Sequence, residues 1–278
     1  IRVGYGADLI YSQWAQRSAH AWRELFRDWR QELFTRTGVL WMARDDDQTI
    51  DDTIATLTRL HVPFESLDRS ALEQRFPQFN FGPITRGLLE PDAGVIMARR
   101  AVQMVVRQAV KQSVDYRITA VTAPTGAGAI DGLAASDGSR LTAGTYVFAC
   151  GPWLPKLFPS VLGGRLRSTR QEVFFFGAEP GDQRFVPPHM PAWIDVAGGV
   201  YGVPDLEGRG FKIGLHHHGP PFDPDTGERI VSEDALQVAR MILAKRVPSL
   251  EQAPLLEARV CQYANSGTGD FLIDQHPD

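Results

Sequence analysis

The sequence is short of cysteine, has no surplus of basic residues and contains no long apolar run. Its 278 residues include two cysteines, Cys150 and Cys261, which are too few for a disulfide framework. So few cysteines indicate a reduced, cytoplasmic setting. One disulfide between the two is nevertheless compatible with the sequence. The formal net charge of -4 argues against nucleic acid or an acidic membrane surface as a partner. No apolar run reaches the roughly twenty residues that span a bilayer, and no signal peptide opens the chain. We therefore expect a globular protein with no membrane or nucleic-acid partner.

A dinucleotide-binding fingerprint, G-x-G-x-x-G between a strand and a helix, is also absent. The glycines at 4 and 6 are followed by Leu9 at the third glycine position, and those at 126 and 128 are followed by Asp131. The sequence begins at Ile1 rather than Met and stops at Asp278 just after an apolar run, so we expect that both ends are cut.

Apolar residues that recur every three or four positions predict helices. These are expected at 11–34, 47–61, 66–76, 96–112 and 233–246. Apolar runs bounded by Gly, Pro and Asp predict strands. These are expected at 37–42, 116–121, 146–150, 173–176, 199–203, 211–215, 257–263 and 271–274, with a hairpin turn at 137–138.

Two kinds of strand predict two kinds of sheet. The uninterrupted apolar run 146–150 suits a sheet covered on both faces, whereas the short strands from about residue 170 onward favour an antiparallel sheet. The predicted fold class is therefore α/β plus antiparallel β, in a chain that crosses several times between a helix–strand layer and an antiparallel layer.

Three polar side chains, Tyr201, Lys212 and His216, lie on two of the predicted antiparallel strands. Because residues two apart on a strand share a face, Lys212, Gly214 and His216 should point the same way, and the glycine should leave room for a ligand. The alternatives are a solvated lysine on an edge strand, and a metal site or plain exposure for the histidines at 216–218. Consecutive histidines on a strand point to opposite faces, so a single metal site fits poorly and we expect none.

A second stretch, 258–263, contains Cys261 and is followed by an apolar and polar run at 270–277. Together with the stretch from Lys212 to His216, it resembles the pattern around the flavin-linking cysteine and the flavin-facing lysine and histidine of the monomeric sarcosine oxidase and N-methyl-tryptophan oxidase family. Further segments occur in family order at plausible spacing, namely 37–40, 90–95, 149–153 and 222–225. The resemblance covers essentially the whole chain, and the ordered set is more specific than any single motif.

The resemblance implies an incomplete Rossmann-type FAD domain interleaved with an antiparallel-sheet substrate domain. The FAD-binding part would comprise 1–32, 93–165 and 264–278, and the substrate domain 33–92 and 166–263. By the same analogy, the first strand, its Gly-rich loop and the first helix would precede Ile1, which would explain the missing fingerprint.

For the cofactor, the resemblance implies that Cys261 forms a thioether to the flavin ring, the alternative being a small buried hydrophobe. Lys212 would lie over the flavin and stabilise the negative charge that grows on dioxygen. Ile118 would contact the adenine portion through its backbone. Gly151 and Trp153 would follow the strand that passes the diphosphate and ribityl region, or would simply form a Gly-Pro turn that caps a strand.

For the substrate, the resemblance implies that Tyr201 and His216 line a cavity in which His216 orients or polarises the amine. Tyr263 would form an aromatic wall of this cavity, or would pack in the core. Arg2 would bind the substrate carboxylate through its guanidinium fork, or would be an exposed arginine near a frayed terminus.

These roles imply an FAD-dependent oxidase of N-methyl amino acids or similar secondary amines. Such an enzyme passes a hydride equivalent from the amine carbon to FAD, releases an imine that water hydrolyses, and reduces dioxygen to hydrogen peroxide. One alternative is another flavin-dependent amino acid or amine dehydrogenase with the same fold. The other is an inactive fragment with a structural or interaction role.

Overall fold

The computed structural model describes residues 1–126 and 128–277. They form two compact units. Unit 1 comprises Ile1–Val105, Glu172–His217 and Ile230–Arg259, and unit 2 comprises Val106–Gln171, His218–Arg229 and the residues from Val260 onward. The division into an FAD-binding part and a substrate domain stays a prediction.

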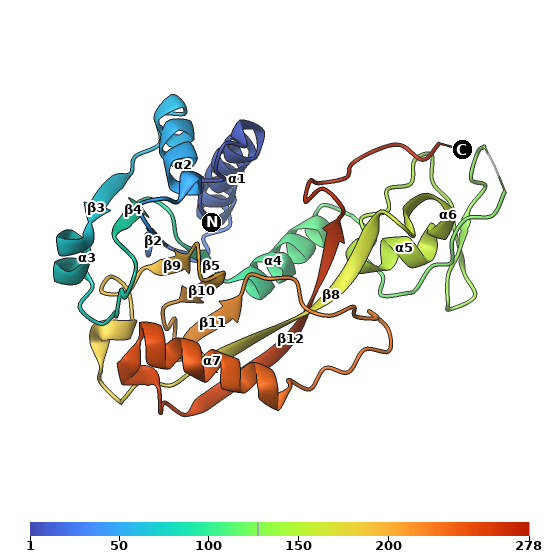
Figure 1. Cartoon of the computed structure of the whole chain (residues 1–278). Coiled ribbons are helices and arrows are strands. Elements are labelled where there is room, and N and C mark those ends of the chain that lie inside the picture. The colour runs from blue at the N-terminus through green and yellow to red at the C-terminus, as the bar shows by residue number, and fades with distance from the viewer. Residues whose placement is uncertain (127, 278) are drawn as a thin grey trace. The chain divides into compact units, whose positions relative to one another are not determined.

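An eight-stranded mixed sheet organises unit 1, and two of its strands, β8 and β12, continue beyond that unit along the chain (Figure 1). The strand order is β12-β8-β11-β10-β9-β2-β4-β3. The strands are β2 Val39–Ala43, β3 Glu65–Asp68, β4 Arg86–Glu90, β8 Leu166–Phe176, β9 Ala192–Asp195, β10 Val200–Val203, β11 Phe211–Leu215 and β12 Leu255–Ser266. β2 and β9 are parallel, whereas β10 pairs antiparallel with β9 and with β11, and β11 with β8. The predicted antiparallel strands from residue 173 to residue 215 and the mixed α/β fold class are confirmed.

The helices of unit 1 follow the predicted periodicity. They are α1 Leu9–Asp28, α2 Gln48–Arg59, α3 Arg69–Arg75 and α7 Glu233–Arg246, together with the first part of α4 Ala98–Lys111, a helix that continues past Val105 into unit 2. Side-chain oxygens of Asp47, Asp68 and Ser232 accept hydrogen bonds from first-turn backbone N–H groups and so set the starts of α2, α3 and α7. The predicted helix 66–76 was wrong at its beginning, because the residues up to Asp68 belong to β3. The first helix ends earlier than predicted, and a short strand, β1 Phe34–Thr35, pairs with β5 Val95–Ile96.

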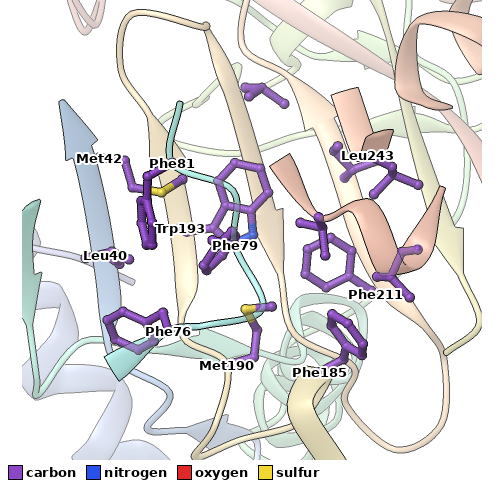
Figure 2. Packing of buried hydrophobic residues seen from close by; sticks show 14 of the residues in the cluster. Leu40, Met42, Phe76, Phe79, Phe81, Phe185, Met190, Trp193, Phe211 and Leu243 are labelled. Atoms are coloured by element: carbon purple, nitrogen blue, oxygen red, sulfur yellow. The ribbon is translucent and has the colours of Figure 1, made fainter. Parts of the chain in front are cut away.

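The main core of unit 1 lies under one face of this sheet, where α7 covers it (Figure 2). Trp193 is 1% exposed, and its ring stacks on Phe211 at 6.3 Å and meets the edge of Phe79 at 5.4 Å. Leu243 of α7 is fully buried in the same cluster. A large aromatic core of this kind holds the strands rigidly, so that side chains on the other face have defined positions.

The opposite face of the sheet, which we call the cavity face, carries the row Trp41, Ile194, Tyr201 and Gly214 across β2, β9, β10 and β11. Lys212 lies in the next row, opposite Val203 on one side and Phe175 on the other. The two-residue alternation that places Lys212 and Gly214 on one face is therefore confirmed.

Unit 2 contains a small hairpin and a series of short helical turns. The hairpin joins β6 Leu133–Ala134 to β7 Arg140–Leu141, and Gly138 at its turn has a φ of 82°, as the predicted turn requires. A 3-10 turn at Gly151–Trp153 leads into α5 Leu154–Leu157 and α6 Pro159–Leu162.

Three predicted strands, 116–121, 146–150 and 271–274, are wrong, apart from an isolated bridge at Val121. Ile118 is 90% exposed, and Val147 and Ile273 are each 86% exposed. An apolar run becomes a strand only when a neighbour pairs with its backbone, and in the described part of the chain no ladder forms along these runs.

Candidate functional site

A cavity of about 810 Å³ opens on the cavity face, and unit 1 supplies its whole lining. Arg2 and Tyr5 come from the segment before α1, Trp41 from β2 and Tyr201 from β10, and His216 directly follows β11. Arg2, Tyr201 and His216, three of the residues singled out from the sequence, therefore line the same cavity. Pockets for small molecules and cofactors usually measure about 300–1,000 Å³, so this one is large enough for either.

Arg2 is held between two aromatic rings. Its guanidinium carbon lies 4.2 Å from the ring centre of Tyr5 and 4.6 Å from that of Trp41, and its Nη1 donates a hydrogen bond to the Gly4 carbonyl. Burial lowers the pKa of Arg2 from its ordinary value, because the charged form loses solvent. A partly desolvated guanidinium that two aromatic rings contact suits a planar anion such as a carboxylate.

Gly214 serves a different purpose from the one expected. A Cβ at Gly214 would lie 2.7 Å from both Cζ and Oη of Tyr201. The glycine thus makes room for the Tyr201 ring, and the interpretation that it leaves room for a ligand was wrong.

Lys212 is a neighbour of this site. Its Nζ lies 5.3 Å from the centre of the Tyr201 ring, at cation–π distance. Within the part of the chain that the structure describes, Lys212 is beside the cavity lining and does not belong to it.

His216 reaches the cavity from the turn after β11. Its backbone N–H donates to the Gly199 carbonyl at 2.7 Å, which fixes the turn. A Cβ at Gly199 would meet the ring of His217 at 2.2 Å, so the next histidine packs its ring against the same glycine. Among residues 1–126 and 128–277, no three His, Cys, Asp or Glu side chains gather in a way that could hold a metal ion.

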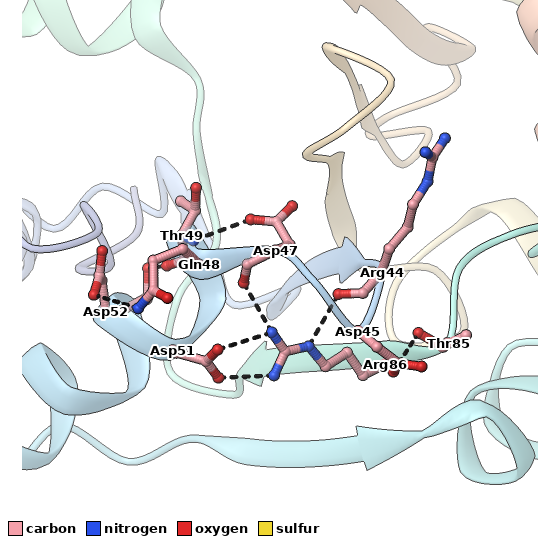
Figure 3. Close-up of polar contacts among 10 residues, drawn as sticks. Arg44, Asp45, Asp47, Gln48, Thr49, Asp51, Asp52, Thr85 and Arg86 are labelled. Atoms are coloured by element: carbon pink, nitrogen blue, oxygen red, sulfur yellow. Dashed lines mark hydrogen bonds and ion pairs between the residues drawn. The ribbon is translucent and has the colours of Figure 1, made fainter.

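The rim of the cavity includes Thr49 and Asp52 of α2. Figure 3 shows how Arg86 of β4 anchors the start of this helix, with Nη1 and Nη2 2.7 and 3.1 Å from the two carboxylate oxygens of Asp51. Nη2 also donates to the Asp47 carbonyl at 2.8 Å. The hydrogen bond from Arg86 lowers the pKa of Asp51, so the pair stays charged.

The remaining predicted residues belong to unit 2. Cys261 and Tyr263 are half-buried on β12. Ile118 is almost fully exposed, and Gly151 has a φ of 51°, in the left-handed region that favours glycine. The indole of Trp153 donates to Asp225 Oδ1 at 2.7 Å.

Both cysteines are free, so the disulfide that the sequence allowed is not formed. In the described residues, no helix is both long and apolar enough to cross a membrane.

Sequence reasoning missed Trp41, Tyr5 and Glu90, which surround Arg2. Glu90 was noticed only as part of a turn that supports the resemblance. An arginine with aromatic residues nearby in sequence was the available signal for Tyr5, but Trp41 and Glu90 lie too far along the chain for any local pattern.

Comparison with known proteins assigns the chain to a family, because the family model "FAD dependent oxidoreductase" matches residues 1–278. The chain belongs to the FAD dependent oxidoreductase family. This member is 27% identical over 286 residues to monomeric sarcosine oxidase from Streptomyces avermitilis, covering 99% of this chain and 73% of that enzyme. It is 26% identical to N-methyl-L-tryptophan oxidase from Salmonella arizonae, covering 100% of this chain and 74% of that protein. The resemblance inferred from the motifs is confirmed.

The fold of this FAD dependent oxidoreductase is also found in solved structures. L-proline dehydrogenase from P. horikoshii superimposes with a TM-score of 0.81 at 17% identity, covering 96% of this chain and 70% of that one. At such identity the likeness establishes the fold alone.

The side chains on the cavity face of unit 1 suit the flavin ring of FAD. A flavin ring needs apolar walls and a few polar groups at its edges, and the cavity face offers Trp41, Ile194 and Val203 with Lys212 beside them. The sequence has no G-x-G-x-x-G fingerprint for the diphosphate.

Proposed function

We propose that this protein is an FAD-dependent oxidase of N-methyl amino acids or similar secondary amines. The observation that carries the proposal is the convergence of Arg2, Tyr201 and His216 on one cavity. The relatives named sarcosine oxidase and N-methyl-L-tryptophan oxidase support this substrate class. FAD, when bound, supplies the acceptor for the hydride equivalent removed from the amine carbon.

Different residues of the cavity would bind the carboxylate end and the amine end of the substrate. The Arg2 fork would pair with the substrate carboxylate, and the nearby rings of Tyr5 and Trp41 would limit the movement of the guanidinium. Tyr201 and His216, which line the same cavity, would receive the amine end, where His216 would orient or polarise the amine. The amine would lose a hydride equivalent from carbon and a proton from nitrogen to become an imine, which water then hydrolyses.

Lys212 would act on the oxidative half of the reaction. Its ammonium is a fixed positive charge on the cavity face, and such a charge favours the negative charge that dioxygen gains on its way to hydrogen peroxide. Cys261 would hold FAD through a thioether, with Tyr263, Ile118, Gly151 and Trp153 contributing as the resemblance implies. Two free thiols suit a cytoplasmic setting.

Oxygen consumption and peroxide formation with sarcosine, N-methyl-L-tryptophan and L-proline test this function. Lys212→Met in the same protein should slow reoxidation far more than flavin reduction in stopped flow, and equal effects on both half-reactions would remove the role of Lys212. Turnover with an artificial electron acceptor but not with dioxygen would favour the dehydrogenase alternative. A colourless protein that oxidises no amine would favour the inactive fragment.

The visible spectrum tests the covalent link directly. Yellow colour that stays with the protein after acid precipitation, and is lost to the supernatant in Cys261→Ser, is the expected result. Colour released from the wild-type protein by acid would contradict the thioether.

A further inference from the structure

Glu90, at the end of β4, is a buried carboxylate to which the proposed chemistry assigns no task. It is 1% exposed and belongs to the segment 90–95 that carries part of the family resemblance. Among the described residues, no ion pair with an arginine or lysine uses its oxygens. A buried carboxylate is costly unless several hydrogen bonds stabilise it, so its contacts should indicate why it is there.

Three N–H groups point at this carboxylate. Oε2 accepts from the backbone N–H of Val3 at 2.7 Å, and Oε1 accepts from that of Gly4 at 3.2 Å and from the Trp41 indole at 2.9 Å. The backbone donors directly follow Arg2, and the indole belongs to one of the two rings that flank its guanidinium. One carboxylate therefore holds both the backbone that follows Arg2 and the Trp41 ring that contacts its guanidinium.

The backbone at Gly4 is packed so closely that only a glycine fits there. A Cβ at Gly4 would lie 2.6 Å from Thr53 Cγ2 and 3.1 Å from both Glu90 Oε1 and the Trp41 ring. The glycine brings the backbone N–H into reach of Glu90, and Glu90 in turn prevents residues 3 and 4 from moving away from the sheet.

The charge of Glu90 also matters for Arg2. The negative charge raises the pKa of Arg2 and so opposes the lowering by burial, which is the larger effect. Glu90 exerts this influence without a direct hydrogen bond to the guanidinium, so the guanidinium keeps N–H donors for a ligand.

We propose that Glu90 is a positioning residue for recognition of the substrate carboxylate, acting through Arg2 and Trp41; this inference rests on the carboxylate-binding role proposed for Arg2. A carboxylate is needed because it only accepts hydrogen bonds and faces three donors. Glutamine at 90 would turn an NH₂ group toward at least one N–H, which would push away either the indole or the backbone of residues 3 and 4.

The test compares a carboxylate substrate with its amide. Steady-state kinetics of the whole protein are measured with sarcosine and N-methyl-L-tryptophan and with the carboxamide of each. In Glu90→Gln we expect KM for the carboxylate substrates to rise about tenfold or more, as for the loss of a buried charged hydrogen bond, with kcat changed less than about threefold. KM for the carboxamides should stay nearly constant, because the amide makes no ion pair with Arg2.

Two further variants keep the test decisive. Glu172→Gln is the matched control, since that carboxylate also accepts two hydrogen bonds, from Ser232 N at 2.7 Å and Ser232 Oγ at 3.2 Å, and does not line the cavity. It should leave KM for both kinds of substrate unchanged. Trp41→Phe keeps a ring over Arg2 and removes one donor to Glu90, so it should shift the preference in the same direction as Glu90→Gln. It decides the matter if Glu90→Gln does not fold.

The outcomes separate the two proposals. If wild-type protein prefers the carboxylates and the substitutions at 90 and 41 leave that preference intact, the role of Glu90 is refuted while the function stands. If wild-type protein oxidises acid and amide with equal KM, the role of Arg2 falls, and the inference about Glu90 falls with it. If it oxidises neither, the proposed function itself is refuted.

Discussion

The buried ion pair between α7 and the sheet allows a quantitative prediction. Arg246, in the last turn of α7, places Nε 2.7 Å and Nη2 2.6 Å from Asp195 Oδ2, and both side chains are 3% exposed. Asp195 Oδ1 accepts from Gly198 N at 2.9 Å, and Arg246 Nη1 donates to the Phe81 carbonyl at 2.9 Å. Because Asp195 ends β9, this pair ties α7 to a strand that borders the cavity.

Asp195→Leu would leave a guanidinium buried with no counter-charge. Removing one partner of such a pair costs about 3–5 kcal/mol. In a domain of this size, each kcal/mol lowers Tm by about 2–4 °C, so we expect Tm to fall by about 6–20 °C. In the double variant Asp195→Leu with Arg246→Met, no buried charge remains, and the loss should be smaller than for Asp195→Leu alone. The Phe81 carbonyl then lacks its donor, so the double variant should still be less stable than wild type.

Urea and thermal unfolding of the wild type, both single variants and the double variant form the required cycle. Asp115→Asn is the control, because its pairing with Arg117 is exposed and its loss should change Tm much less. If the loss in the double variant equals the sum of the two single losses, the pair is not coupled and the reasoning is refuted.

Two further predictions concern the cavity face and unit 2. Gly214→Ala should push the Tyr201 ring into the cavity and raise KM for the amine without preventing folding; an unchanged KM would contradict the tight contact that the glycine relieves. In unit 2, hydrogen bonds from Lys156 and from the backbone of Thr226 and Asp225 hold the pKa of Asp223 well below its usual range. Its stabilising effect should therefore be complete above the unfolded-state pKa of about 3.9 and be lost as the pH falls through the lower folded-state pKa. The difference in unfolding free energy between wild type and Asp223→Asn, measured in urea, should accordingly be largest near neutral pH and shrink in strong acid; a difference that grows in acid would contradict this assignment.

Much of the fold could be predicted from the sequence because it depends on local chemistry. The helix at 233–246 has an apolar stripe, a Ser232 cap and two acidic residues in its first turn, and it lies where the periodicity places it. The strands bearing Tyr201 and Lys212 are short runs between glycine turns, and two-residue alternation was enough to place Lys212 and Gly214 on one face.

The failures share one cause. The run 146–150 has strand propensity, but propensity does not supply a neighbouring strand, and its residues do not join a ladder. Gly214 was interpreted as open space because the sequence does not show which side chain lies across from it.

The amino-acid order alone determined the helices, the short antiparallel strands and the family, since each follows from dihedral preference, periodicity or a set of motifs in order. Only the tertiary structure decided that Arg2 lies between Tyr5 and Trp41 and that Glu90, 87 residues from Val3, holds this arrangement. Contacts between residues so far apart depend on how the strands pair and on which side chains fill the space between them, and no local pattern encodes that.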